Sequence, residues 1–139
     1  MTKKNKILVT GGLGYIGSHT IVKLLEKNYE VVCLDNLTNS DLSTKKKISK
    51  ITKKKFKFHN IDLTNLNDLK KILKKYDKIG CVIHFASSIY VPESMEQPIQ
   101  YYRNNLTSLL NIVEISKKYN SSLIFSSSST VYGNPKKFP

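Results

Sequence analysis

The sequence predicts a doubly wound α/β domain, in which helices cover both faces of a parallel sheet. Two observations predict it. Short apolar, β-branched runs alternate with amphipathic helical patterns along the chain, and a glycine-rich turn joins the first strand to the first helix. Strands that alternate with helices of this length pair in parallel through right-handed crossovers. A chain of 139 residues suffices for one such domain with its own core.

Each element of the N-terminal half follows from its own pattern. The first strand is expected at residues 6–10, where an apolar run ends at the glycines. The first helix is expected at residues 14–27, with apolar side chains at helical spacing at Ile16, Ile21, Leu24 and Leu25. Residues 30–34 are apolar on both faces, as in a central parallel strand. A polar loop at residues 35–43 and a Lys-rich helix to about residue 52 complete this half.

The C-terminal half repeats the alternation. A short third strand is expected at residues 56–60, before a helix marked by Leu66, Leu69, Ile72 and Leu73. A fourth strand at residues 80–86, a long helix at residues 98–119 and a fifth strand at residues 122–126 follow. We expect the strand order 3-2-1-4-5, which brings the residues after each strand to one edge of the sheet. The strand-following residues there are Gly11, Asp35, Asp62, Ser87 and Ser126.

Two further expectations concern the long helix and the last residues. An apolar stripe on the long helix is predicted to be its core face, and packing against a second subunit is the alternative. The stripe consists of Tyr101, Tyr102, Leu106, Leu109, Leu110 and Val113.

Residues 134–139 are predicted to form a loop, where a complete doubly wound domain usually adds a helix and a strand. The sheet is therefore expected to be incomplete at the C-terminus, and the chain to be the N-terminal part of something longer.

Glycines at the first strand-to-helix turn predict a site for a dinucleotide, which makes the domain Rossmann-type. Gly12, Gly14 and Gly17 satisfy the G-x-G-x-x-G pattern directly after a strand and before a helix. Glycine lets backbone N–H groups approach a diphosphate, and the helix start presents further N–H groups to it. The alternative is a tight turn without a ligand.

Acidic residues after the second and third strands predict which dinucleotide binds. Asp35, 18 residues after Gly17, is placed to accept hydrogen bonds from the adenosine ribose. It would repel the 2′-phosphate of NADP, and no arginine lies nearby, so NAD is favoured. Asp62 is placed to bind the adenine amino group. Asp35 can also cap the next loop, and this role is compatible with ribose binding. For Asp62 the alternative is a helix N-cap before Leu66.

Composition argues against several other functions. The net charge of +13 comes almost entirely from lysine, with Arg103 the one arginine in the sequence, so the lysine-rich run at residues 45–55 is interpreted as a solvated helical face in preference to a nucleic-acid-binding patch. No apolar run approaches the ~18 residues of a membrane span, and no secretory signal is expected at the N-terminus. Cys33 and Cys81 lie in apolar strands, which suits a reducing, cytoplasmic compartment. His19, His59 and His84 lack metal-ligand spacing, so no metal is expected.

Four blocks in register carry a family resemblance over essentially the whole chain. They are TGGLGYIGSHT at residues 10–20, DNLTNS at residues 35–40, YYRNN at residues 101–105 and SSSSTVYG at residues 126–133. With these blocks the sequence resembles the extended short-chain dehydrogenase/reductase superfamily and, within it, the UDP-glucose 4-epimerase family. Related nucleotide-sugar dehydratases typically carry Thr and an acid where this chain has Ser128 and Ser129.

The resemblance implies a mechanism and a set of site residues. In the family, NAD takes a hydride from C4 of a UDP-hexose. The 4-keto sugar then rotates about its phosphate linkage, and the hydride returns to the opposite face of C4. Ser128 would act as the catalytic serine that hydrogen-bonds the 4-hydroxyl. The residues implied to bind NAD are Gly11, Gly14, Tyr15, Ile16 and Gly17 at the diphosphate, Asp35, Asn36, Leu37, Thr38, Asn39, Ser40, Asp62 and Leu63 at the adenosine, Phe85, Ala86, Ser87, Ser88 and Ile89 at the nicotinamide side, and Asn104 and Ser126.

The chain also departs from the family pattern. The family's base is the tyrosine of a helical Tyr-x-x-x-Lys motif, whereas Tyr132 and Lys136 have that spacing across a turn. The resemblance also implies a C-terminal substrate domain to which no block of this sequence corresponds, so the chain alone is expected to be inactive. It further implies a homodimer for the full-length form. Many members have Gly and Lys where Ser87 and Ile89 stand. Three alternatives stay open: a non-catalytic NAD-binding module, a related nucleotide-sugar dehydratase or epimerase, and a basic nucleic-acid binder.

Overall fold

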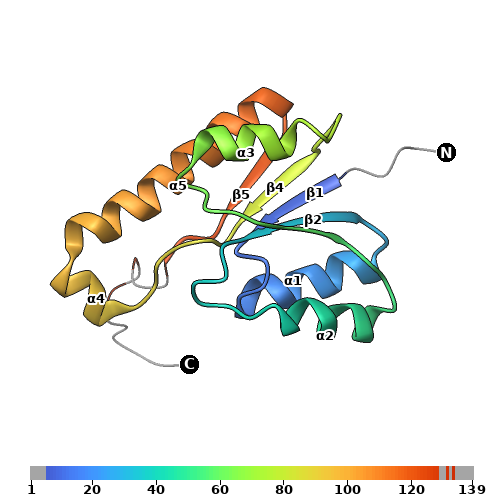
Figure 1. Cartoon of the computed structure of the whole chain (residues 1–139), viewed down its shortest axis with the longest axis horizontal. Helices are drawn as coiled ribbons and strands as arrows, with labels where there is room; N and C mark the ends of the chain where they lie inside the picture. Colours follow the sequence, from blue (N-terminus) through green and yellow to red (C-terminus); the bar gives the residue numbers. More distant parts are fainter. Residues whose placement is uncertain (1–5, 129–130, 132, 134–139) are drawn as a thin grey trace.

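A computed structural model describes residues 6–128, 131 and 133. Within these residues the chain forms a five-stranded parallel sheet with helices on both faces (Figure 1). The strands are β1 (Lys6–Thr10), β2 (Glu30–Asp35), β3 (Lys57–Asn60), β4 (Cys81–His84) and β5 (Ser122–Phe125). The helices are α1 (Tyr15–Glu26), α2 (Ser43–Thr52), α3 (Leu66–Leu73), α4 (Val91–Glu96) and α5 (Pro98–Tyr119). The sheet order is β3-β2-β1-β4-β5, which confirms the predicted order and the doubly wound, Rossmann-type class.

The strand register brings the carboxyl ends of the strands together. β1 lies in the centre, where Thr10 is opposite Leu34 of β2 on one side and His84 of β4 on the other. On the outer sides, Asp35 is opposite Asn60 of β3, and His84 is opposite Phe125 of β5. The loops that follow the strands therefore share one edge of the sheet, as predicted.

Alternate residues of the strands feed two separate hydrophobic cores. On the face that α3 and α5 cover (Figure 1), the core includes Leu8, Val32, Leu34, Val82, Leu69, Leu73, Ile112 and Ile115. On the face of α1 and α2, it includes Ile7, Val9, Val31, Cys33, Ile83, Ile21, Leu25 and Ile48. Burial on both faces explains why the central strands read as continuous apolar runs.

The prediction for the core face of α5 is wrong. The side chains that α5 buries are Ser108, Asn111, Ile112, Ile115 and Ser116. Tyr102, Leu106, Leu110 and Val113 are exposed instead, with 66% of Leu110 accessible, while Tyr101 and Leu109 are partly buried. Polar residues therefore occupy part of the buried face of α5. Asn111 can be buried because its amide donates to the Leu63 carbonyl on a neighbouring loop. Apolar content therefore does not mark the buried face of this helix.

Other boundaries differ by a few residues. α4 is an additional short helix that was not expected, with Pro92 in its first turn, where a missing N–H costs nothing. β4 ends at His84, so Phe85 and Ala86 belong to the following loop. The interpretations of Ser129, Thr130, Tyr132 and residues 134–139, including the turn before Lys136, fall outside the described residues.

Candidate dinucleotide-binding site

The turn after β1 is built for close backbone approach. Gly11 has φ +62°, and a Cβ there would lie 2.8 Å from the backbone nitrogen of Ala86. Its N–H donates to the Leu34 carbonyl at 2.8 Å, which ties the turn to β2. A Cβ on Gly17 would run into the carbonyl oxygen of Gly11 and lie 2.7 Å from the Cα of Gly12. Glycine is thus required at both ends of the turn.

The start of α1 points open N–H groups at this turn. Its N-cap is Gly14, no side chain caps it, and its first turn carries no acidic residue. Tyr15, with 84% of its side chain exposed, and Ile16 leave the first turn open to solvent. The first N–H groups of a helix have no partner within the helix and carry partial positive charge. The turn therefore fits a diphosphate group.

Beneath the turn lies a buried thiol. A Cβ on Gly12 would come within 2.6 Å of the sulfur of Cys33 and 2.8 Å of Cδ1 of Ile21. Burial, followed by the nearby charge of Asp35, raises the pKa of the Cys33 thiol to about 12. Cys33 is therefore a protonated packing residue that supports the turn from the core side, not a nucleophile.

Asp35 holds the second loop of the site. One carboxylate oxygen accepts the N–H of Leu13 at 2.9 Å, and the other accepts the N–H of Leu37 at 3.0 Å and the hydroxyl of Ser40 at 2.8 Å. The side chain is almost fully buried. It joins the glycine turn to the loop of residues 36–40, so the alternative reading as a loop cap is correct. A carboxylate offers about four acceptor positions, which leaves it capacity for a ligand hydroxyl.

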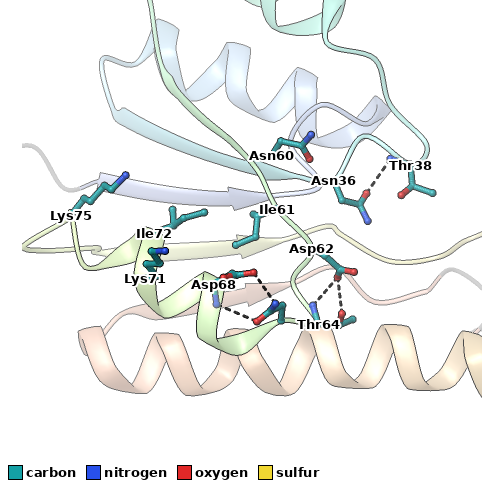
Figure 2. Close-up of a pocket in the computed structure, with 11 residues that line it drawn as sticks. Asn36, Thr38, Asn60, Ile61, Asp62, Thr64, Asp68, Lys71, Ile72 and Lys75 are labelled. Carbon is teal, nitrogen blue, oxygen red and sulfur yellow. Dashed lines mark hydrogen bonds between the residues drawn. The ribbon is translucent and has the colours of Figure 1, made fainter.

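Asp62 and Leu63 follow β3 beside an open pocket. The carboxylate of Asp62 accepts the N–H and the hydroxyl of Thr64, both at 2.8 Å. The N-cap of α3 is Asn65, which accepts the N–H of Asp68, so the alternative of Asp62 as that N-cap is wrong. Leu63 is buried in the core. Figure 2 shows the pocket, of about 900 Å³, with Asn36, Thr38 and Asp62 near one end and Lys75 at the other.

A buried histidine anchors the loop after β4. His84 is 2% exposed, and its Nδ1 lies 2.7 Å from the hydroxyl of Thr10, which also accepts the N–H of Ala86 at 3.4 Å. Burial lowers the pKa of His84 to about 4, so the ring is neutral at pH 7. A neutral Nδ1 can accept the proton of the Thr10 hydroxyl. The interpretation of His84 as a satisfied core residue is confirmed.

The same loop is held from the other side by α5. Asn104 donates to the hydroxyl of Ser88 at 2.9 Å. Asn105 accepts the N–H of Ser88 at 2.7 Å and donates to its carbonyl at 3.1 Å. Sequence reasoning selected Asn104 and missed Asn105, although the Asn-Asn pair was visible within the block of residues 101–105. Ser87 and Ile89 are exposed on this loop.

The end of β5 lies next to β4. The N–H of Ser126 donates to the His84 carbonyl at 3.1 Å, which extends the strand pairing by one residue. Ser126 and Ser128 are both exposed, and the carbonyl of Ser128 accepts the N–H of Val131 at 3.3 Å. The described structure thus brings the glycine turn, Asp35, Asp62, the loop of residues 85–89 and the β5 end to one sheet edge.

The described residues contain neither a cluster suited to a metal ion nor a helix suited to a membrane. Across residues 6–128, 131 and 133, no group of three or more His, Cys, Asp or Glu side chains is arranged to hold a metal ion. Among the helices in that part of the chain, none has both the length and the apolar character needed to cross a membrane.

Comparison with known proteins identifies the class to which this fold and site belong. Residues 8–139 match the family model described as GDP-mannose 4,6 dehydratase, and the chain belongs to this family. Within it, the chain is a homologue of UDP-glucose 4-epimerases. It is 49% identical over 132 residues to the UDP-glucose 4-epimerase of Schizosaccharomyces pombe, covering 94% of this chain and 37% of that protein. Against the Pasteurella multocida epimerase the identity is 48% over 134 residues, covering 96% and 39%.

Solved structures agree with this assignment. The UDP-glucose 4-epimerase of Bifidobacterium longum, crystallised in complex with NAD+ and UDP, superimposes with a TM-score of 0.89 and 41% identity over 97% of this chain and 40% of that one. The Stenotrophomonas maltophila enzyme, with bound NAD and formylated UDP-arabinopyranose, superimposes with a TM-score of 0.88 and 36% identity. The match again covers 97% of this chain and 40% of that one. The chain spans about two fifths of the length of the relatives that it matches.

Proposed function

We propose that this chain is the NAD-binding part of an enzyme that interconverts UDP-glucose and UDP-galactose by epimerisation at C4. The observation that carries the proposal is the turn after β1. Side chains are sterically excluded there at Gly11 and Gly17, and the uncapped start of α1 follows at once. A homologue of the same fold is crystallised with NAD+ and UDP, which supports the same ligands here.

In this proposal each loop at the sheet edge contacts one part of NAD. Gly11, Gly14, Tyr15, Ile16 and Gly17 surround the diphosphate. The adenosine lies against residues 35–40, Asp62 and Leu63, where the remaining acceptor capacity of Asp35 suits a ribose hydroxyl and its charge disfavours a 2′-phosphate. Residues 85–89, Asn104 and Ser126 face the nicotinamide side. NAD bound there supplies the hydride acceptor and donor for C4.

Ser128 is proposed to hold the sugar. Its exposed position beyond β5, on the same edge as the glycine turn, suits a hydrogen bond to the 4-hydroxyl that helps the proton leave. In this role Ser128 orients the substrate, and a separate general base accepts the proton. That base is proposed to lie in the part of the enzyme beyond the two fifths that this chain matches.

A homodimer is proposed as the working form. The exposed members of the predicted stripe on α5, together with Ile99 one turn earlier, form an exposed stripe. Its residues recur at intervals of three or four along one side of the helix: Ile99, Tyr102, Leu106, Leu110 and Val113. Large apolar side chains gathered in this way on one face are typical of an association surface. A second copy of the chain, presenting the same stripe, can cover it symmetrically.

Binding and turnover test the proposal separately. Calorimetric titration of the chain should give saturable NAD binding and at least tenfold weaker NADP binding; equal affinities would contradict the role of Asp35.

Turnover is tested in a chimera. Residues 1–139 of this chain replace the matching segment of the Pasteurella multocida epimerase, and the conversion of UDP-galactose is measured. Ser128→Ala should lower kcat at least about tenfold, because it removes a group that touches the substrate. Ser127→Ala, at the neighbouring exposed position, is the control. A 4-keto-6-deoxy product would favour a dehydratase instead.

A further inference from the structure

We infer that Asn105 and Asn111 are a pair of positioning residues through which α5 fixes both cofactor loops of the site. Asn105 bridges to the loop after β4, and Asn111 bridges to the loop after β3. The inference rests on the proposed function for its meaning, because those two loops are the proposed nicotinamide-side and adenosine-side contacts. It adds two residues with a defined task to that site.

The Asn105 bridge uses both polar ends of one amide. Its Oδ1 accepts the N–H of Ser88 at 2.7 Å, and its Nδ2 donates to the carbonyl of Ser88 at 3.1 Å. Both backbone groups of a single loop residue are thereby satisfied by one side chain. An ionised aspartate accepts but cannot donate, and an alanine does neither, so neither residue at position 105 can make both bonds. The bridge fixes the loop at its midpoint, between Phe85 and Val91.

The Asn111 bridge uses the two hydrogens of one amide nitrogen. Nδ2 donates to the Leu63 carbonyl at 2.8 Å and to the Thr64 carbonyl at 3.0 Å. Asn111 is 8% exposed, so these bonds are shielded from water. The loop that carries Asp62 and Thr64 passes beside α5 (Figure 2). The bridge therefore sets the distance of Asp62 from the helix.

One rigid element carries both bridges. Asn105 and Asn111 are six residues apart on a 22-residue helix, which corresponds to about 9 Å along its axis. Neither residue belongs to the exposed apolar stripe of α5, and neither contributes an apolar side chain to the core. Burial of an amide at position 111 costs free energy unless it is hydrogen-bonded. Its two bonds to loop carbonyls explain why a polar residue occupies a core-facing position of the helix.

Hydrogen–deuterium exchange tests both bridges without any ligand. Asn105→Ala should accelerate exchange of the Ser88 amide about tenfold and leave residues 61–65 unchanged, because the lost bonds are local. Asn111→Ala should accelerate exchange in residues 61–65 and leave residues 85–89 unchanged. Gln100→Ala removes an exposed amide from the same helix and is the matched control. Acceleration of both loops by one variant, or of neither, would overturn the inference.

Binding measurements add a readout that a general loss of stability would not give. Asn105→Ala should weaken NAD binding about three- to tenfold and leave AMP binding unchanged, because AMP lacks the nicotinamide half. Asn111→Ala should weaken NAD and AMP by the same factor. Asn105→Asp, which keeps an acceptor for the Ser88 N–H, should retain more NAD affinity than Asn105→Ala. Equal loss of AMP affinity in both alanine variants would contradict the assignment. If the wild-type chain binds neither nucleotide, the proposed function fails, while the exchange data still decide the bridges.

Discussion

Gly17 stands where the first turn of α1 passes over the glycine turn, and no side chain fits there. A Cβ would collide with the carbonyl oxygen of Gly11 and lie 2.7 Å from the Cα of Gly12. Both neighbours are backbone atoms, so they cannot move aside as the end of a flexible side chain can. Relief requires α1 to shift away from β1, which would also move the N–H groups proposed to bind the diphosphate.

Gly17→Ala is therefore expected to reduce the free energy of unfolding by about 1–3 kcal/mol, the usual cost of overpacking. NAD affinity should fall with it. Urea denaturation measures the first effect and calorimetric titration the second. Thr20→Ala, which removes a hydroxyl bonded to the Ile16 carbonyl on the exposed side of α1, should change stability by less than about 0.5 kcal/mol. A Gly17→Ala variant as stable as the wild type would show that the turn has more room than the structure gives it.

The burial of His84 makes the free energy of unfolding sensitive to acid. Burial lowers its pKa from 6.5 to about 4, so the unfolded chain takes up a proton in this range that the folded chain does not. The corresponding stability is complete above pH 6.5 and is lost as the pH falls toward 4. A difference of this size corresponds to at most about 3 kcal/mol.

His84→Asn tests this point, because its Oδ1 can still accept the hydroxyl of Thr10. The free energy of unfolding of the variant should fall less steeply between pH 6.5 and 4 than that of the wild type, as measured by urea denaturation at each pH. Carboxylates protonate in both proteins and cancel in the comparison. His19→Gln, which removes an exposed imidazole from α1, is the control. Parallel pH profiles for wild type and His84→Asn would contradict the assigned titration.

At the scale of the element, α5 has an outer apolar stripe and a partly polar inner face. Ile112 and Ile115 are fully buried, whereas Leu106 and Leu110 are more than half exposed. Ile112→Ala should therefore cost about 2–5 kcal/mol of unfolding free energy. Leu110→Gln should cost less than about 0.5 kcal/mol in the monomer. A large loss for Leu110→Gln at a protein concentration where the chain is monomeric would restore the core reading of the stripe.

The same pair of variants separates packing from association. If the stripe covers a second copy of the chain, Leu110→Gln should shift sedimentation equilibrium toward the monomer, while Ile112→Ala should act on folding instead. Unchanged association in Leu110→Gln would count against the stripe as the dimer surface.

The predicted stripe on α5 was assigned to the core because helical spacing does not show what an apolar face packs against. Its apolar residues lie on one side of α5, and helical spacing is equally consistent with a core and with an association surface. The buried face is set by Ser108, Asn111 and Ser116 together with the isoleucines. The small side chains of Ser108 and Ser116 are buried there. The amide of Asn111 bonds to the carbonyls of Leu63 and Thr64, which are distant in the sequence. No local pattern contains those partners.

At the scale of the whole molecule, the sheet order was predictable because it follows from crossover handedness and the position of the glycine turn. The residues after β1, β2 and β3 could be predicted to lie together for the same reason, because the strand ends determine which loops meet. That they bind a ligand remains a prediction. The bridges from Asn105 and Asn111 were not predictable, since each joins residues 17 or more positions apart. The short helix α4 was also missed, because six residues give too little periodicity to distinguish it from loop.

By themselves, these 139 residues are expected to bind NAD without turning over a UDP-sugar. The turn after β1, Asp35 and the loop after β4 are supplied within the described residues, so a polypeptide confined to this sequence should bind NAD. It should not epimerise UDP-galactose, because the chain spans only about two fifths of the length of its epimerase relatives. A coupled assay for UDP-glucose, run with saturating NAD, measures turnover, and fluorescence titration of the same sample measures binding. Turnover would mean that a base exists among these residues. Absence of both turnover and NAD binding would mean that the sheet edge needs further polypeptide to hold its loops in place.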